Sequence, residues 1–166
     1  MKGAYAMPNK HLATYLNDHL AGAATAIELL RHLLDVERDP DRRAQLQQIS
    51  LDVEKDRLTL KQIMQAADVS ESEPRKAAGW IAGKAAQIKL RLDDPDSGDL
   101  YRLQSLEALV LGIEGKFALW RALREVLVGV RNDLADFDSL ERRAESQATI
   151  VDRLRIEAAK GALSIR

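Results

Sequence analysis

Apolar residues recur at three- and four-residue steps along most of the chain, which is the spacing of one face of an α-helix. After Pro8-Asn9, a first stripe predicts a helix over residues 10–36. It consists of Leu12, Tyr15, Leu16, His19, Ala23, Ile27, Leu30 and Leu34. Asp39-Pro40-Asp41 then supplies a cap and a proline at a first helical position, and predicts a second helix over 41–67. Its stripe consists of Leu46, Ile49, Val53, Asp56, Leu60, Ile63 and Ala67. The short link between the two helices makes them antiparallel neighbours.

Two more long helices follow in the second half of the chain. The polar turn over residues 93–99 precedes a stripe that predicts a helix over 99–131. That stripe consists of Leu103, Leu106, Val110, Ile113, Phe117, Trp120 and Leu127. Asp138-Ser139-Leu140-Glu141 has the spacing of a capping box, with Asp in place of Ser or Thr, and predicts a fourth helix over 138–162. Its apolar face carries Ala144, Gln147, Val151, Leu154 and Ala158.

The segment between the second and third of these helices carries a shorter, more basic pattern. Ser72-Glu73-Pro74 predicts that a helix begins there and runs over about 74–92. A helix of ~16 residues spans ~24 Å, enough to run along a bundle. The second and third bundle helices would then be parallel, as in ferritin-like folds with one crossover. An up-down-up-down bundle is the alternative. We therefore predict an all-α fold in one domain over residues 1–166.

Composition narrows the class of protein. Lys and Arg total 25 against 26 Asp and Glu, so the chain has no basic field to attract nucleic acid. The absence of cysteine excludes disulfides, thiol catalysis and iron–sulfur clusters. Residues 1–8 lack the apolar region of a signal peptide, and no later run approaches the ~20 apolar residues of a membrane span. We expect a cytoplasmic protein without nucleic-acid or membrane partners.

A few polar residues interrupt the apolar stripes. His19, Asp56 and Gln147 fall on them, while Glu107 and Glu114 lie one step off the stripe of the third bundle helix. In a crossover bundle, Asp56 and Glu114 come near the level of Ala23, a turn from His19. The sequence therefore predicts a polar layer in the middle of the bundle.

This layer has two interpretations. His19, Asp56 and Glu114 could ligate iron, manganese or zinc, because imidazole and carboxylate groups suit these metals, and such an ion could activate water or oxygen. Alternatively, Asp56 pairs with bases and the layer sets only the helix register. The candidate bases on neighbouring helices are Lys116, Arg121, Arg153 and Arg155. We prefer the second interpretation because it is easier to satisfy.

Glycines and tryptophans add two further expectations. Gly22, Gly112 and Gly115 lie inside predicted helices, where each costs roughly 1 kcal/mol relative to Ala. We expect them to allow close helix approach or a partner surface. Trp80 and Trp120 suit packing better than the wall of a ligand site.

Three segments carry a family resemblance. They are LATYLNDHLAGA at 12–23, VEKDR at 53–57 and LVLGIEGKFALW at 109–120. With them the chain resembles a group of uncharacterised bacterial helical proteins related to the ferritin-like superfamily, over residues 12–123. The resemblance implies a four-helix bundle with a crossover and, for some relatives, metal or oxygen chemistry.

The ligands of that chemistry are missing here. Ferritin-like di-metal sites use a Glu on each of two helices and Glu-x-x-His on each of the other two. His11, His19 and His32 all lie on the first predicted helix, and no Glu-x-x-His occurs. We therefore predict a non-enzymatic ferritin-like bundle that acts through association, as a homodimer, and assign no cofactor. The alternative is a metal-binding protein with the unorthodox site His19, Asp56 and Glu114. A third hypothesis is a small-molecule binder with a pocket between helices.

Overall fold

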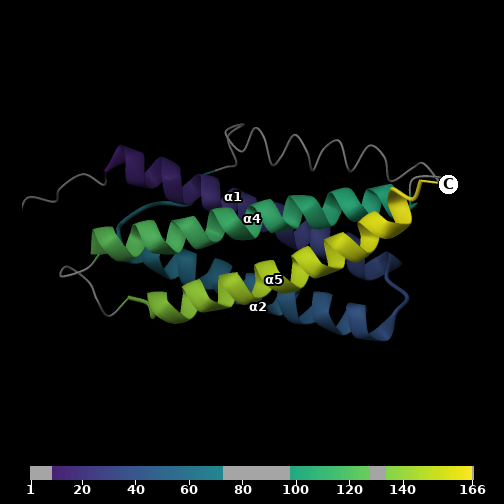
Figure 1. Ribbon diagram of the computed structural model, residues 1–166. Helices are drawn as coiled ribbons and strands as arrows, with labels where there is room; N and C mark the ends of the chain where they lie inside the picture. The colour runs from purple at the N-terminus through teal and green to yellow at the C-terminus, as the bar shows by residue number, and fades with distance from the viewer. Residues whose placement is uncertain (1–8, 73–97, 128–133, 166) are drawn as a thin grey trace, which may run out of the picture.

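The computed structural model describes residues 9–72, 98–127 and 134–165, which form helices and no strand (Figure 1). The helices are α1 (Lys10–Val36), α2 (Pro40–Ala66), α4 (Gly98–Leu127) and α5 (Phe137–Ala162). The all-α class is confirmed, and the four predicted long helices begin within one residue of these bounds. The predicted crossover helix over 74–92 and residues 128–131 of the predicted third bundle helix lie outside the described residues. None of the described helices is long and apolar enough to cross a membrane.

Side-chain caps fix where three of the helices begin. The Asn9 side chain accepts from the His11 amide at the start of α1, and the Asp39 side chain accepts from the Arg42 amide ahead of α2. At α5 the cap is Asp136, whose Oδ1 accepts from the Ser139 amide at 3.0 Å. The predicted capping box at Asp138 was therefore placed two residues late, because the carboxylate that reaches the free amide belongs to Asp136.

Polar contacts at the helix ends establish the directions of the helices. Asn17, early in α1, bonds to the carbonyl of Ser70 at 3.2 Å and to the amide of Ser72 at 2.8 Å, just beyond the end of α2. Glu37, just beyond the end of α1, pairs with Arg102 near the start of α4 at 2.7 Å. Helix α1 is thus antiparallel to both α2 and α4, so α2 and α4 run in the same direction (Figure 1).

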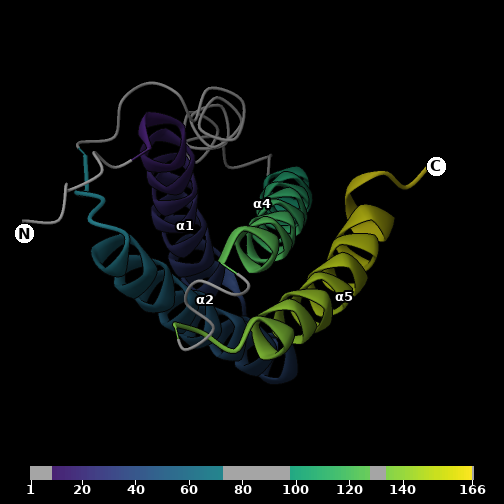
Figure 2. The ribbon, with the colours of Figure 1, turned by 90° about the vertical axis from the view of Figure 1, so that its left-hand side faces the viewer.

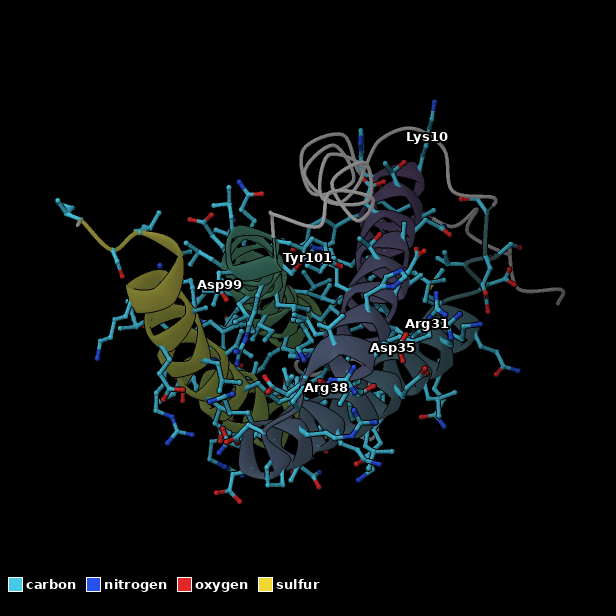
Figure 3. The ribbon with its side chains drawn as sticks, turned by 90° about the vertical axis from the view of Figure 1, so that its right-hand side faces the viewer. Lys10, Arg31, Asp35, Arg38, Asp99 and Tyr101 are labelled. Atoms are coloured by element: carbon cyan, nitrogen blue, oxygen red, sulfur yellow. The ribbon has the colours of Figure 1, made fainter. Side chains whose placement is uncertain are left out.

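Viewed along their axes, the helices form a four-cornered bundle (Figure 2). Helix α1 packs on α2 and α4, and α5 packs on α4 and α2. Figure 3 shows one end of this arrangement, with Tyr101 between α4 and α1 and Asp99 between α4 and α5. The largest fully buried side chains come from α1, α2 and α4. They are Leu16, Leu30, Leu33, Leu46, Ile49, Ile63, Met64, Leu106, Leu109, Leu119, Trp120 and Leu123.

A buried carboxylate ties three of the helices together at the end where α1 stops. Glu37 is only 7 % exposed. It accepts from Arg42 Nε at 3.2 Å and from the Asp39 amide at 2.8 Å, and it pairs with Arg102 of α4. Burial alone would raise the pKa of Glu37, but these hydrogen bonds and the two arginine charges outweigh it and hold the pKa below its usual value.

We expect Glu37→Gln to lower the free energy of unfolding at pH 7 by about 1.5–3 kcal/mol, the range for hydrogen bonds to a charged group. Because the folded-state pKa is depressed, this stability is present above the unfolded pKa of about 4.3 and is lost as the pH falls through the folded value. Urea unfolding from pH 7 down to pH 3 should therefore show the two proteins converging in acid. Glu125→Gln, at an exposed position of α4, serves as the control and should match the native protein throughout. A Glu37→Gln deficit that is independent of pH would contradict this account.

Candidate functional site

A buried ion-pair layer crosses the middle of the bundle. Asp56 of α2 is 2 % exposed. Its Oδ2 accepts from Lys116 Nζ of α4 at 2.6 Å, and its Oδ1 accepts from Arg143 Nε of α5 at 2.9 Å. Arg143 adds a second bond through its terminal nitrogen, and Lys116 also donates to Gln147 Oε1 of α5. One carboxylate therefore joins α2, α4 and α5, and we call Asp56, Lys116, Arg143 and Gln147 the polar layer.

The cations of the polar layer lie beside acidic groups. Lys116 and Arg143 share the carboxylate of Asp56, and the negative charge of Asp52 on α2 also acts on Lys116. Burial lowers the pKa of Lys116, although the neighbouring Asp56 carboxylate acts in the opposite direction. About 30 % of the Arg143 side chain is exposed to solvent.

The predicted layer exists, but its composition differs from the proposed metal-ligand set. Asp56 occupies the predicted place and Lys116, one of the four candidate bases, pairs with it. Glu114 is exposed, because it lies about 100° around α4 from Ile113, on the outward face. Among the residues that the structure describes, no group of three or more His, Cys, Asp or Glu side chains is arranged to hold a metal ion. The structure therefore does not bring His19, Asp56 and Glu114 together as ligands.

Arg143 was missed by the sequence reasoning. It lies in the charged run that begins α5, next to Glu141 and Arg142, where a solvated salt-bridged face is the ordinary interpretation. The signal that could have found it is its spacing, since Arg143 precedes the buried Gln147 by four residues and therefore shares its face.

Next to the polar layer, residues of α1, α2 and α4 line a partly open cavity of about 350 Å³. Small residues of α1 line one side of it, among them Gly22, Ala23 and Ala26. Helix α4 contributes Gly112, Gly115 and Trp120 to the opposite side. A volume of this size falls within the range of small-molecule sites in proteins.

Among the described residues, the three glycines inside helices do not serve close helix approach, which was the first of the two expectations from the sequence. The second, a partner surface, stays a prediction. A Cβ built on Gly22, Gly112 or Gly115 meets no atom within 4 Å, so described residues leave open space at each of them. All three line the cavity. Compared with alanine at the same positions, the three glycines leave the cavity larger by the volume of three methyl groups.

Several polar groups border the cavity. Asp56 and Lys116 belong both to the polar layer and to the cavity wall. His19 also lines the cavity, and its ring meets Tyr15 edge-on with the centroids 4.7 Å apart. Burial lowers the pKa of His19 and outweighs the opposing effect of the Asp18 charge, which favours the neutral imidazole.

Trp120 is a wall residue with an unused donor. It is 1 % exposed, and its Nε1 has no hydrogen-bond partner in the part of the chain that the structure describes. A buried indole N–H ordinarily finds an acceptor. Trp120 thus packs in the core, as expected from its place on the apolar stripe, and its N–H group is inaccessible to solvent.

Comparisons of this chain with protein-family models, with curated proteins and with solved structures gave no match. The polar layer and the cavity are therefore the features that bear on function.

We expect Asp56→Leu to reduce the free energy of unfolding by about 3–5 kcal/mol, because it leaves the buried Lys116 without its counter-charge. Lys116→Met should cost less, since Arg143 still neutralises Asp56. The double variant should be more stable than Asp56→Leu alone, because it removes the buried charge as well. Denaturant unfolding of the four proteins measures this coupling.

Glu114→Gln is the matched control for the polar layer. As an exposed position it should change the free energy of unfolding by less than about 0.5 kcal/mol. An Asp56→Leu variant as stable as the native protein, or a Glu114→Gln variant that loses several kcal/mol, would show that the layer is assigned to the wrong residues.

Proposed function

We propose that this protein is a ferritin-like bundle that binds a small, largely apolar molecule in the cavity between α1, α2 and α4, without catalysing a reaction on it. The antiparallel pairs α1/α2 and α4/α5, with α2 and α4 running in the same direction, support the ferritin-like connectivity. The function itself is argued from the cavity.

The observation that carries the proposal is the convergence of three helix-interior glycines on one cavity. Each Gly costs about 1 kcal/mol relative to Ala, so the three together cost about 3 kcal/mol. That is a large fraction of the 5–15 kcal/mol by which a domain of this kind is stable. Since a Cβ at these positions would meet open space, packing between described residues does not require glycine. A ligand that fills the space explains why glycine occupies these three positions despite its cost to the helices.

The charged groups at the cavity favour binding over catalysis. Both oxygens of Asp56 accept hydrogen bonds from cations, so this carboxylate is poorly placed to act as a base or as a metal ligand. Arg57, another wall residue, lies 3.9 Å from Glu54. These groups stabilise a fixed polar surface beside an apolar one, which is the usual composition of a binding pocket.

Gly112 provides the test of this proposal. We expect Gly112→Ala to raise the free energy of unfolding by about 0.5–1 kcal/mol, because the added methyl group enters open space and favours the helix. Gly112→Leu should fill part of the cavity and weaken binding of 1-decanol, an apolar probe, at least tenfold in isothermal titration calorimetry. Circular dichroism would check that the helices are retained.

Ala118→Leu is the matched control, because Ala118 is exposed on the same helix, and it should leave decanol binding unchanged. A native protein that binds no decanol would refute the proposal. A Gly112→Ala variant that is destabilised would restore the interpretation of close helix approach.

A second candidate function is association of two copies through the outer face of α2. Leu51 and Leu58 are 55 % and 57 % exposed and lie seven residues apart, two turns along the same face. Sedimentation equilibrium should then give a dimer that Leu58→Lys converts to a monomer, whereas Glu145→Ala, at an exposed position of α5, should leave it dimeric. A monomeric native protein at high concentration would exclude this candidate.

A further inference from the structure

We propose that the molecule bound in the cavity is an uncharged alcohol, with a hydroxyl group that hydrogen-bonds to the ring of His19 and an apolar body along the glycine-lined wall. This inference rests on the proposed binding function and adds the chemical class of the ligand.

The strongest polar groups of the cavity wall are already bound within the protein. Both oxygens of Asp56 accept hydrogen bonds from cations, and the Lys116 ammonium donates to Asp56 and Gln147. Arg57 lies 3.9 Å from the Glu54 carboxylate. A ligand that took one of these groups as its partner would compete with an existing ion pair, so the anchor of the ligand is expected elsewhere on the wall.

Within the part of the chain that the structure describes, His19 is a polar wall group without a hydrogen bond. It is half-buried and lines the cavity, and its ring meets Tyr15 edge-on. Burial lowers the pKa of His19 and favours the neutral ring, in which one nitrogen donates a hydrogen bond and the other accepts one. A hydroxyl group also donates and accepts, so it complements whichever nitrogen faces the cavity.

The charges around the cavity favour an uncharged ligand. Among the described residues, the charged side chains that line it are two acids and two bases, Asp18, Asp56, Arg57 and Lys116. Two more acids, Asp52 and Glu54, act on the bases, and Arg143 pairs with Asp56. Asp18 is half-buried and keeps contact with solvent. An ion entering the cavity would lose part of its hydration and find these charges already compensated.

The rest of the wall accommodates an apolar body. His19 lies near one end of the part of α1 that lines the cavity, and Ala26 lies seven residues further along, ~10 Å away at 1.5 Å per residue. Between them, Gly22 and Ala23 present nothing larger than a methyl group. Because α1 is antiparallel to α4, Leu109 lies at the Ala26 end. A medium-length primary alcohol, with its hydroxyl group at His19 and its chain toward this aliphatic end, has the matching distribution of atoms.

The test compares three probes that share one alkyl chain. 1-Decanol, decanoate and decylammonium are titrated into the full-length protein at pH 7.5, each below its aggregation concentration, by isothermal titration calorimetry. Decanol should bind roughly tenfold more tightly than either ion, because neither ion finds a free counter-charge. An ion that binds as tightly as decanol would overturn the assignment of an uncharged ligand and leave the proposed function intact. No binding of any probe would overturn both.

Two variants of His19 test the anchor. His19→Phe keeps an aromatic ring but removes both nitrogens, and should weaken decanol binding about fivefold, the loss of one hydrogen bond. His19→Gln keeps a donor and an acceptor, and should retain most of the native affinity. His11→Phe, at an exposed position of the same helix, is the control and should bind decanol like the native protein.

Thermal unfolding of each variant separates binding from folding. A His19→Phe protein that binds decanol as tightly as the native protein would overturn the role of His19. So would a His19→Gln protein that keeps the native melting temperature and binds decanol as weakly as His19→Phe.

Discussion

The packing of this bundle depends on the carboxylate of Asp56. A buried charge carries a desolvation cost of several kcal/mol and is tolerated only where partners neutralise it and satisfy its hydrogen bonds. Here the two cations come from different helices, Lys116 from α4 and Arg143 from α5. A shift of either helix by one turn would separate a cation from the carboxylate. Apolar packing alone tolerates several registers, so the polar layer selects the one in which α2, α4 and α5 fit together.

That register also determines where the cavity opens. With Lys116 held against Asp56, the neighbouring positions of α4, including Gly112 and Trp120, line the side that faces α1. Helix α1 is held by polar contacts near its ends, through Asn17 at one and Glu37 at the other. Between these contacts it presents small residues to α4. The cavity thus lies where α1 and α4 face each other with glycine and alanine residues, which are too small to fill the space between them.

How well a feature of this protein could be predicted from the sequence depends on the positional precision that the feature requires. The periodicity of apolar residues spans many turns, so the long helices could be placed to within one residue at their starts. A site requires the orientation of single side chains. Glu114 and Lys116 are two positions apart, yet one is exposed and the other reaches Asp56. Arg143 was hidden in a charged run because its long side chain reaches inward from a polar segment.

A pocket between helices was one hypothesis from the sequence, but its position could not be inferred, and the reason is physical. A glycine inside a helix can allow a neighbouring backbone to approach closely, or it can line an empty space. The sequence looks the same in both cases. The two cases are distinguished only by the distance from a Cβ placed on the glycine to the nearest atoms. Here no atom of the described residues lies within 4 Å of that position. The same ambiguity links structure to function, because Lys116 is both a partner of Asp56 and a wall of the cavity. If the proposed ligand occupies the cavity, it lies against the lysine that holds α4 in register with α2. A molecule that binds only the folded bundle also stabilises it, so occupancy and stability are coupled.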